Sequence, residues 1–392
     1  MNKIQYQRRQ FMQMGLTGFG CFLAGGVTGL RSSAQSAPFY SLASIGPLQE
    51  PDANGIMLPT GFQSRMVART GTTPMAGGDY FWHARPDGGA CFPTPEGGWV
   101  YVSNSEVGRG RGGVGALRFN SSGEVVDAYS ILDNTSVNCA GGATPWGTWL
   151  SCEEFDAGQV YECDPLGNRA AVVRPALGTF QHEAVAVDMA NNVIYLTEDE
   201  RDGGFYRFIS AAGLPDLSAG RLEIASVQAR DGQRSVQWLP VPDPLAASLP
   251  TREQVPGYSP FAGGEGIALH DSKIYFTTKH DNRVWCYDTV SHEIDPIYDV
   301  ATSGNPILSG VDNVVITPAG DVLVCEDGGD MQIVLITPDY QPLPLLQIVG
   351  QDRSEICGAA FDPSFQRLYF SSQNGFGSAG ITYEITAAAS AA

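Results

Sequence analysis

The chain has 392 residues, and its 42 acidic residues outnumber its 23 basic residues to give a net charge of −19. Nucleic acid and anionic membranes are poor partners for so acidic a chain, because their phosphates repel it. Its length is enough for one large domain or two ordinary ones.

The first 37 residues have the pattern of an export signal. Adjacent Arg8 and Arg9 precede a glycine-rich apolar run and then a stretch of small residues, in the order of a charged, an apolar and a cleavage region. The segment "RRQFM" is similar to the twin-arginine signal, and the apolar run is too short and too rich in glycine to span a membrane. We therefore expect residues 1–37 to be a signal peptide for the twin-arginine translocase. Residues 38–392 should then be periplasmic or secreted, without a stable membrane anchor.

The leader contains four basic residues and no acid, so the rest of the chain carries 19 basic against 42 acidic residues. These acids either form a solvated surface or gather to bind cations. Seven of the eight cysteines follow the leader, and an odd number cannot all pair within one chain. No C-x-x-C motif occurs, which disfavours a zinc site built from thiolates.

Short apolar strands recur along the chain, each followed by turn residues and another strand. Corresponding points are spaced by 44, 82, 47 and 45 residues and fall at Cys139, Glu183, Glu265, Asp312 and Cys357. The long gap holds a proline-rich insertion, residues 241–260. With the unit near residues 95–130, the pattern predicts an all-β fold, a six-bladed β-propeller with long inter-blade insertions. We expect "GFQSRMVART" to close the ring with the last blade and residues 38–392 to form a single domain. A β-sandwich or a two-domain all-β protein is the alternative.

Acidic residues recur at two places in these repeats. One group begins the innermost strand and comprises Glu183, Glu265 and Asp312. The other ends the next strand and comprises Glu106, Glu153, Glu154, Glu198, Asp199, Glu326 and Asp327. In a propeller both places lie at one mouth of the channel, where so many carboxylates would repel one another unless cations lay between them. Hard cations such as calcium use many oxygen ligands, so the pattern predicts a cation site at that mouth.

A resemblance to a known family covers residues from about 90 to 380. The segment "NCAGGATPWGTWLSCEE", followed in order by "QHEAV", "YLTEDE", "GGFYRF", "GGEGI" and "CEDGG", resembles the PhoX-type alkaline phosphatases. The resemblance implies a cluster of Fe(III) and Ca²⁺ at the top of a propeller channel, where a small-molecule phosphate monoester is hydrolysed. It implies that Cys139 binds iron as a thiolate. His182 lies beside Glu183 in "QHEAV", and we expect it to hold that carboxylate in place rather than to act as the base of a serine triad. The implied carboxylate ligands are Glu106, Glu154, Glu183 and Glu265, with Asp312, Glu326 and Asp327 as calcium candidates.

The chain departs from this family near the phosphate. Characterised members place an arginine near the "EG" motif, whereas Gly263 and Gly264 precede Glu265 here. Two other arginines, Arg109 and Arg111 in "GRGRGG", could grip a phosphate at the mouth. We expect them to be catalytic, and a merely solvated loop is the alternative.

The sequence therefore predicts an exported, monomeric, metal-dependent phosphoesterase. Two alternatives stay open. A calcium-dependent lactonase or esterase on the same scaffold would need one catalytic calcium and no thiolate. A non-catalytic, calcium-stabilised binding propeller would bind metal without turning over any ester.

Overall fold

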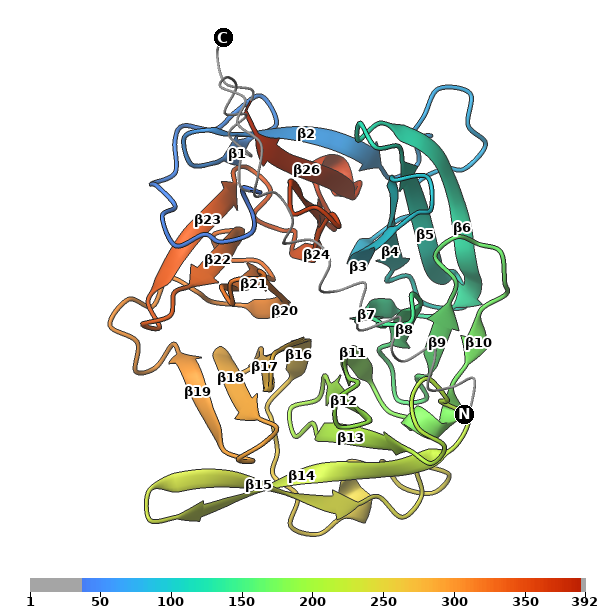
Figure 1. The fold of residues 1–392 in the computed structure, drawn as a ribbon, viewed down its shortest axis with the longest axis vertical. Helices are drawn as coiled ribbons and strands as arrows, with labels where there is room; N and C mark the ends of the chain where they lie inside the picture. The colour runs from blue at the N-terminus through green and yellow to red at the C-terminus, as the bar shows by residue number, and fades with distance from the viewer. Residues whose placement is uncertain (1–36, 389–392) are drawn as a thin grey trace, which may run out of the picture. The chain divides into compact units, whose positions relative to one another are not determined.

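The computed structural model describes residues 37–388, so the predicted export signal lies outside the described residues except for its last position. Six antiparallel sheets surround a central channel (Figure 1). The prediction of an all-β, six-bladed β-propeller is confirmed. Within residues 37–388, the helices are three short 3₁₀ turns, Pro175–Leu177, Arg252–Gln254 and Phe376–Ser378. No helix in this part of the chain is long and apolar enough to cross a membrane.

Each blade begins with the strand that lies nearest the channel and continues outward. The first three blades consist of β3 (Pro86–Pro93), β4 (Trp99–Ser105), β5 (Gly112–Phe119) and β6 (Val125–Thr135); β7 (Asn138–Ala143), β8 (Trp149–Glu153), β9 (Val160–Cys163) and β10 (Val172–Val173); and β11 (His182–Asp188), β12 (Val193–Glu198), β13 (Phe205–Ser210), β14 (Gly220–Arg230) and β15 (Gln233–Pro240).

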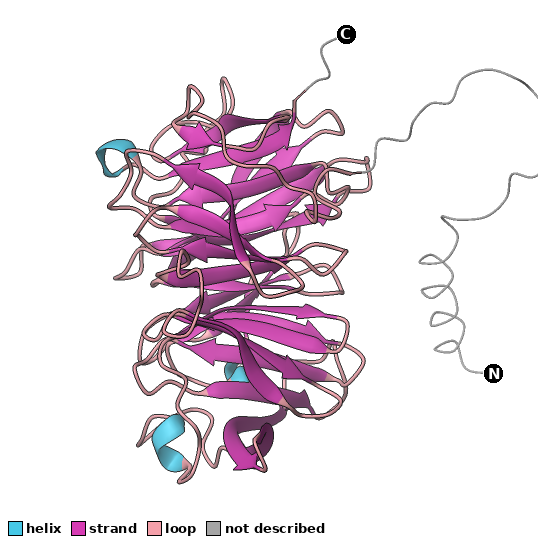
Figure 2. Cartoon of the chain, turned by 90° about the vertical axis from the view of Figure 1, so that its left-hand side faces the viewer, coloured by secondary structure: helices cyan, strands magenta, loops and turns pink. Residues whose placement is uncertain are grey.

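The last three blades follow the same order. They consist of β16 (Gly264–His270), β17 (Lys273–Thr278), β18 (Arg283–Asp288) and β19 (Ile294–Asp299); β20 (Val311–Ile316), β21 (Val322–Glu326), β22 (Gln332–Ile336) and β23 (Pro342–Ile348); and β24 (Ile356–Phe361), β25 (Arg367–Ser372) and β26 (Ile381–Ala387). Figure 2 shows these strands from the side, with the connecting loops gathered at the two faces of the ring.

The ring closes through the N-terminal segment, as the sequence predicted. β2 (Phe62–Arg69) pairs with β26 and completes the sixth blade. β1 (Ile56–Met57) adds a fifth strand to the blade of β20–β23 by pairing with β23. Backbone hydrogen bonds thus join the two ends of the ring, and β2 gives the last blade its fourth strand.

The proline-rich insertion, residues 241–260, packs against the third blade. Val241 and Val255 are buried in the apolar cluster that this blade shares with the second blade. Arg252 donates to the buried carboxylate of Glu198 at 2.7 Å, and Thr251 shares a 2.8 Å hydrogen bond with Tyr206. The insertion is therefore fixed beside the end of β12. The long gap in the repeat also contains β15, a fifth strand that the sequence pattern did not reveal.

Every innermost strand carries a β-bulge near its start, where two residues lie opposite one residue of the next strand. The bulged pairs are 87–88, 139–140, 183–184, 265–266, 312–313 and 358–359. A bulge re-aims a side chain out of the regular alternation of a strand and is common beside functional sites. The side chain opposite a bulge often bonds the bulge of the next blade: Thr197 donates to the Glu265 carbonyl oxygen, and Thr277 to that of Asp312, both at 2.5 Å. The six bulges thus hold their side chains in a fixed ring.

Candidate metal centre

The first residue of each bulge forms an inner ring at one mouth of the channel. Five of the six are potential ligands: Asp87, Cys139, Glu183, Glu265 and Asp312. Ligand atoms of Glu183, Glu265 and Asp312 all lie within 4.8 Å of one another, as do those of Cys139, Glu154 and Glu183. Glu183 belongs to both groups, so it joins them into one continuous site.

The sixth position of this ring is Gly358, not Cys357, which corrects the repeat that we read from the sequence. Cys357 still pairs with Ser371 before the bulge begins. Gly358 has φ +66°, and a Cβ there would lie 2.6 Å from the Asp87 carbonyl oxygen. Only a glycine therefore suits this position. This shift of one residue is visible only in the hydrogen bonds between β24 and β25, which the sequence does not show.

An outer ring comes from the residue that directly follows the second strand of a blade. Five blades place a charged residue there: Glu106, Glu154, Asp199, Lys279 and Asp327. Four are acids and one is a lysine. The sequence pattern had predicted the acids at this mouth, and the structure brings them around the inner ring. Asp199 was predicted to lie at this mouth but was not one of the implied ligands, and Lys279 was not predicted at all.

Paired acids at the ends of second strands divide between two roles. Glu153, Glu198 and Glu326 each accept a hydrogen bond from the backbone N–H six residues later. Glu326 also accepts from the Ser309 N–H, at 2.9 Å. Its carboxylate holds the loop rather than joining the convergent ligand groups, and we leave Glu326 out of the candidate site. The second member of each pair, such as Glu154 or Asp327, faces the mouth instead.

The inner carboxylates are held in an environment that disfavours their charged form. Glu183 is 0% exposed, and neither of its carboxylate oxygens has a hydrogen-bond partner in the described chain. Burial, together with Glu265 and Glu154, raises the pKa of Glu183 well above its usual range. Burial likewise raises the pKa of Glu154 to about 8, with Asp199 and Glu106 adding to the effect. Desolvation and nearby carboxylates also raise the pKa of the Cys139 thiol. Bound cations would relieve all three costs at once.

A third group of potential ligands extends the site toward the last blade. Ligand atoms of Asp87, Glu355 and Cys357 lie within 4.8 Å of one another. Burial, together with Asp327 and Glu106, raises the pKa of Glu355 to about 8. Asp87 and Glu355 were missed in the sequence because neither belongs to a repeated acidic motif: Asp87 follows a proline in "RPDGG", and Glu355 lies directly before β24 in an isolated bridge to Asp327.

Two cations other than the predicted arginines lie at this mouth. Lys279 Nζ is 2.8 Å from Glu265 Oε1, and Arg85 Nη2 is 2.5 Å from Glu106 Oε2. Arg109 and Arg111 are exposed and form none of the ion pairs seen within residues 37–388. Their loop is tied down by the Gly110 N–H, which donates to Ser136 Oγ at 2.8 Å. Their predicted role in binding phosphate stays a prediction.

The other predicted neighbours of the site behave as core residues. His182 Nε2 bonds the Gly178 carbonyl oxygen at 3.0 Å, and its ring packs against Phe180 in a tilted arrangement. It makes no hydrogen bond to Glu183, so the idea that it holds that carboxylate is wrong. Burial lowers the pKa of His182 to about 3. The seven cysteines within residues 37–388 are all free of disulfides.

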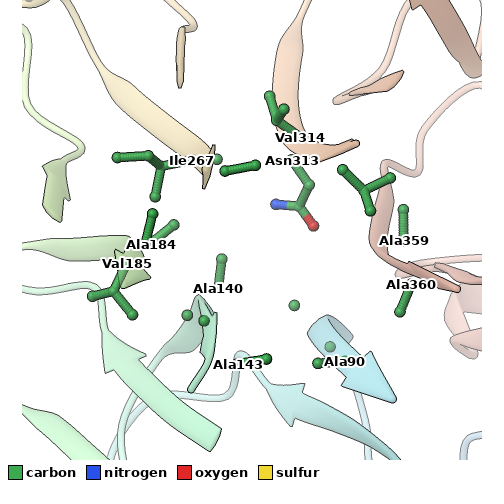
Figure 3. A pocket seen from close by; sticks show the side chains of 18 of the residues that line it. Ala90, Ala140, Ala143, Ala184, Val185, Ile267, Asn313, Val314, Ala359 and Ala360 are labelled. Atoms are coloured by element: carbon green, nitrogen blue, oxygen red, sulfur yellow. The ribbon is translucent and has the colours of Figure 1, made fainter. Parts of the chain in front are cut away.

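Beneath the bulges the channel is lined by small and apolar side chains. A cavity of about 410 Å³ lies there, among residues such as Ala140, Val185, Ile267, Val314 and Ala360 (Figure 3). Asn313 is the polar side chain labelled in this view, and its Oδ1 accepts the Gly358 N–H at 2.7 Å. The acids therefore line the mouth, and none of the residues within 37–388 that line the cavity below is charged.

The fold and this mouth define a class of protein: β-propellers with converging carboxylates and thiols, a candidate metal centre, at the end of the channel. The family model for alkaline phosphatase PhoX matches residues 112–159 and 155–306. The chain belongs to the PhoX alkaline phosphatase family.

Solved structures agree on the fold. PhoX of Pseudomonas fluorescens in complex with vanadate, a transition-state analogue, aligns with a TM-score of 0.73 and 16% identity, over 88% of this chain and 97% of that one. A protein of unknown function from Bacteroides thetaiotaomicron aligns with a TM-score of 0.52 and 9% identity, over 87% and 84%. No curated protein sequence matches this chain significantly.

Proposed function

We propose that this protein is an exported, metal-dependent phosphoesterase that hydrolyses phosphomonoesters at the channel mouth. Membership of the PhoX family suggests alkaline phosphatase activity. The observation that carries the metal dependence is the Glu183 carboxylate, which is fully buried and has both oxygens unpartnered. An ionised carboxylate in that state is costly unless a cation is bound.

The residues present suit a mixed cluster of iron and calcium. Cys139 would supply a soft thiolate for Fe(III), with Glu154 and Glu183 beside it. Glu183, Glu265 and Asp312 would supply hard oxygen ligands of the kind calcium uses, and Asp87 and Glu355 extend that set. Bound metals would supply Lewis acidity toward phosphoryl oxygens and would activate water, so no protein nucleophile is needed.

The chain itself positions these groups. The six bulges hold the inner ligands on rigid strands, and the outer acids close around them from the ends of the second strands. Small residues such as Gly88 and Ala140 follow the ligands in the bulges, so the backbone of neighbouring blades can approach closely: a Cβ on Gly88 would lie 2.4 Å from Ala140 Cα. A site fixed in this way needs little rearrangement when the phosphate binds.

The test is to purify the exported protein, measure its metals by elemental analysis, and assay an aryl phosphate before and after chelation. We expect iron and calcium in the protein and activity that chelation removes and metal restores. A protein that holds calcium without iron and cleaves a lactone would favour the lactonase alternative. Bound metal with no turnover of either ester would favour the binding propeller.

A further inference from the structure

We propose that the ammonium group of Lys279 binds the anionic group of the substrate, a tetrahedral oxyanion such as phosphate, at the channel mouth. This inference rests on the proposed function and assigns part of its anion-binding site to a residue of this chain. Lys279 stands in the outer ring at the position where four other blades carry an acid. It is the one basic residue among those five positions.

The backbone of Lys279 is held firmly at the mouth. The Lys279 N–H donates to the Gly263 carbonyl oxygen at 2.8 Å, and the His280 N–H donates to that of Ala262 at 3.0 Å. Gly263 has φ +73°, and a Cβ there would lie 2.9 Å from His280 Cδ2. The two segments therefore pack too closely for a side chain on Gly263. The long side chain of Lys279 therefore extends from a backbone that is fixed in position.

The ammonium lies between the buried floor of the site and solvent. Lys279 Nζ is 2.8 Å from Glu265 Oε1 and 3.6 Å from one carboxylate oxygen each of Asp199 and Asp327. The Glu265 side chain is 2% exposed, whereas those of Lys279 and Asp327 are 30% and 35% exposed. A ligand arriving from solvent can thus reach the ammonium without displacing the inner ring.

The nearest partner of Lys279, Glu265, is one of the proposed metal ligands. Once Glu265 binds a cation, its charge is neutralised and the ammonium lies beside another positive charge. Asp199 and Asp327 remain 3.6 Å away, and an oxyanion bound between the ammonium and the cation would compensate the added positive charge. An ammonium offers three donors on a flexible stem, and charge-assisted bonds to phosphate oxygens are among the stronger hydrogen bonds in proteins. Lys279 therefore suits the oxyanion better than a permanent carboxylate partner.

A different role would leave a different signature. If Lys279 were a built-in counter-ion that takes the place of one metal, removing its charge would open a cation site among Glu265, Asp199 and Asp327. Metal content and anion affinity therefore separate the two roles.

The experiment uses the metal-loaded mature protein and measures inorganic phosphate binding by titration calorimetry and metal content by elemental analysis. The variants are Lys279→Met, Lys279→Gln and Lys279→Arg. Lys273→Met is the matched control, because Lys273 is exposed at the opposite end of β17.

We expect Lys279→Met and Lys279→Gln to weaken phosphate binding roughly 10- to 100-fold, the range for one lost bond to a charged group. Lys279→Arg should stay within a few-fold of wild type, and metal content should not change. Unaltered phosphate affinity in both neutral variants would overturn the proposal, and so would an additional metal ion per chain.

Phosphate binding does not require turnover, so the two proposals fail separately. A wild type that hydrolyses aryl phosphate but binds phosphate independently of Lys279 would overturn this inference and leave the function standing. A wild type that binds phosphate through Lys279 without hydrolysing any ester would overturn the proposed function and leave this inference standing.

Discussion

The Asn104 side-chain amide donates to the Cys139 carbonyl oxygen at 3.1 Å, across the boundary between the first and second blades. The same amide also donates to the Ala140 carbonyl oxygen at 2.7 Å, and its oxygen accepts from Trp149 and Ser151 at 2.9 Å each. Asn104 is 0% exposed. One buried amide thus holds the backbone of the candidate iron ligand in register with its neighbours.

Replacing this amide should destabilise the fold and disturb the metal centre together. Asn104→Ala leaves buried donors and acceptors without partners, which should lower the free energy of unfolding by about 3 kcal/mol. We also expect less bound metal, because the Cys139 backbone is freed. Chemical denaturation and elemental analysis measure the two effects. Asn305→Ala is the control, since Asn305 is exposed and its side chain makes a single bond, to the Pro342 carbonyl oxygen; it should change stability by less than about 0.5 kcal/mol. An Asn104→Ala protein as stable as wild type would contradict the argument.

The export signal gives a prediction that needs no purified protein. Replacing Arg8 and Arg9 with lysine should leave the precursor in the cytoplasm, because the arginine pair is the feature that the twin-arginine route recognises. Cell fractionation and immunoblotting measure the distribution. Lys3→Arg is a suitable control, since it keeps the charge outside the motif. Normal export of the double variant would mean that the signal belongs to another route.

The blade count and the ring closure were predictable because they depend on patterns that the sequence repeats. Strand-turn-strand units of similar length imply radial repetition, and the strand-like segment "GFQSRMVART" before the first unit was expected to close the ring with the last blade. The strand β15 was missed, because it lies in the one unit that breaks the spacing. A local signal was present in the sequence: Asp231 and Gly232, both with positive φ, form the two-residue turn that joins β14 to β15, and Asp-Gly is a strong hairpin signal.

The candidate site was predictable to the extent that its acids belong to repeated motifs. Glu154, Glu183 and Glu265 were found in this way. Adjacent acids such as Glu326 and Asp327 could not be told apart, because a strand end and the loop beyond it decide which carboxylate turns to the backbone. Lys279 was missed because only acids were sought at the position directly after the second strand of each blade. The fourth blade carries a lysine at this position.

The arginine-rich loop gives a prediction about substrate binding. If Arg109 or Arg111 touches phosphate, its change to alanine should raise KM and lower kcat/KM at least about thirty-fold, as the loss of one charge-assisted contact typically does. Metal content should not change, because neither arginine forms an ion pair with a predicted metal ligand within residues 37–388. Steady-state kinetics on an aryl phosphate measure the effect, with the exposed Arg230→Ala as control. Wild-type kinetics in both variants would show that the loop is merely solvated.

Stability of the metal-free protein should fall as pH rises. Glu154 and Glu355 have pKa values of about 8 in the folded chain, above their ordinary value of 4.5. Between these two pH values the folded state holds protons that the unfolded state has released, so the free energy of unfolding decreases with pH. Metals replace these protons, and their stabilising effect should therefore grow toward pH 8.

Thermal unfolding of chelated and metal-loaded protein between pH 5 and 8.5 measures this difference. Glu154→Gln should reduce the pH dependence of the chelated form, because it removes one of the two groups. A chelated protein whose Tm rises over this range would contradict the raised pKa values of the mouth.

The thiol gives the most direct test of the metal assignment. If Cys139 binds Fe(III), the native protein should be coloured by a sulfur-to-iron charge-transfer band, because a thiolate is an electron-rich ligand for an oxidising metal. Cys139→Ser should lose this band, most of the iron and most of the phosphatase activity. Cys286→Ser is the matched control, since Cys286 is a partly exposed free thiol in β18, outside every convergent ligand group in residues 37–388, and it should keep all three. Absorption spectra and elemental analysis decide the question before any assay. A colourless native protein that contains calcium and no iron would exclude the thiolate role of Cys139 and would strengthen the case for a calcium-only propeller.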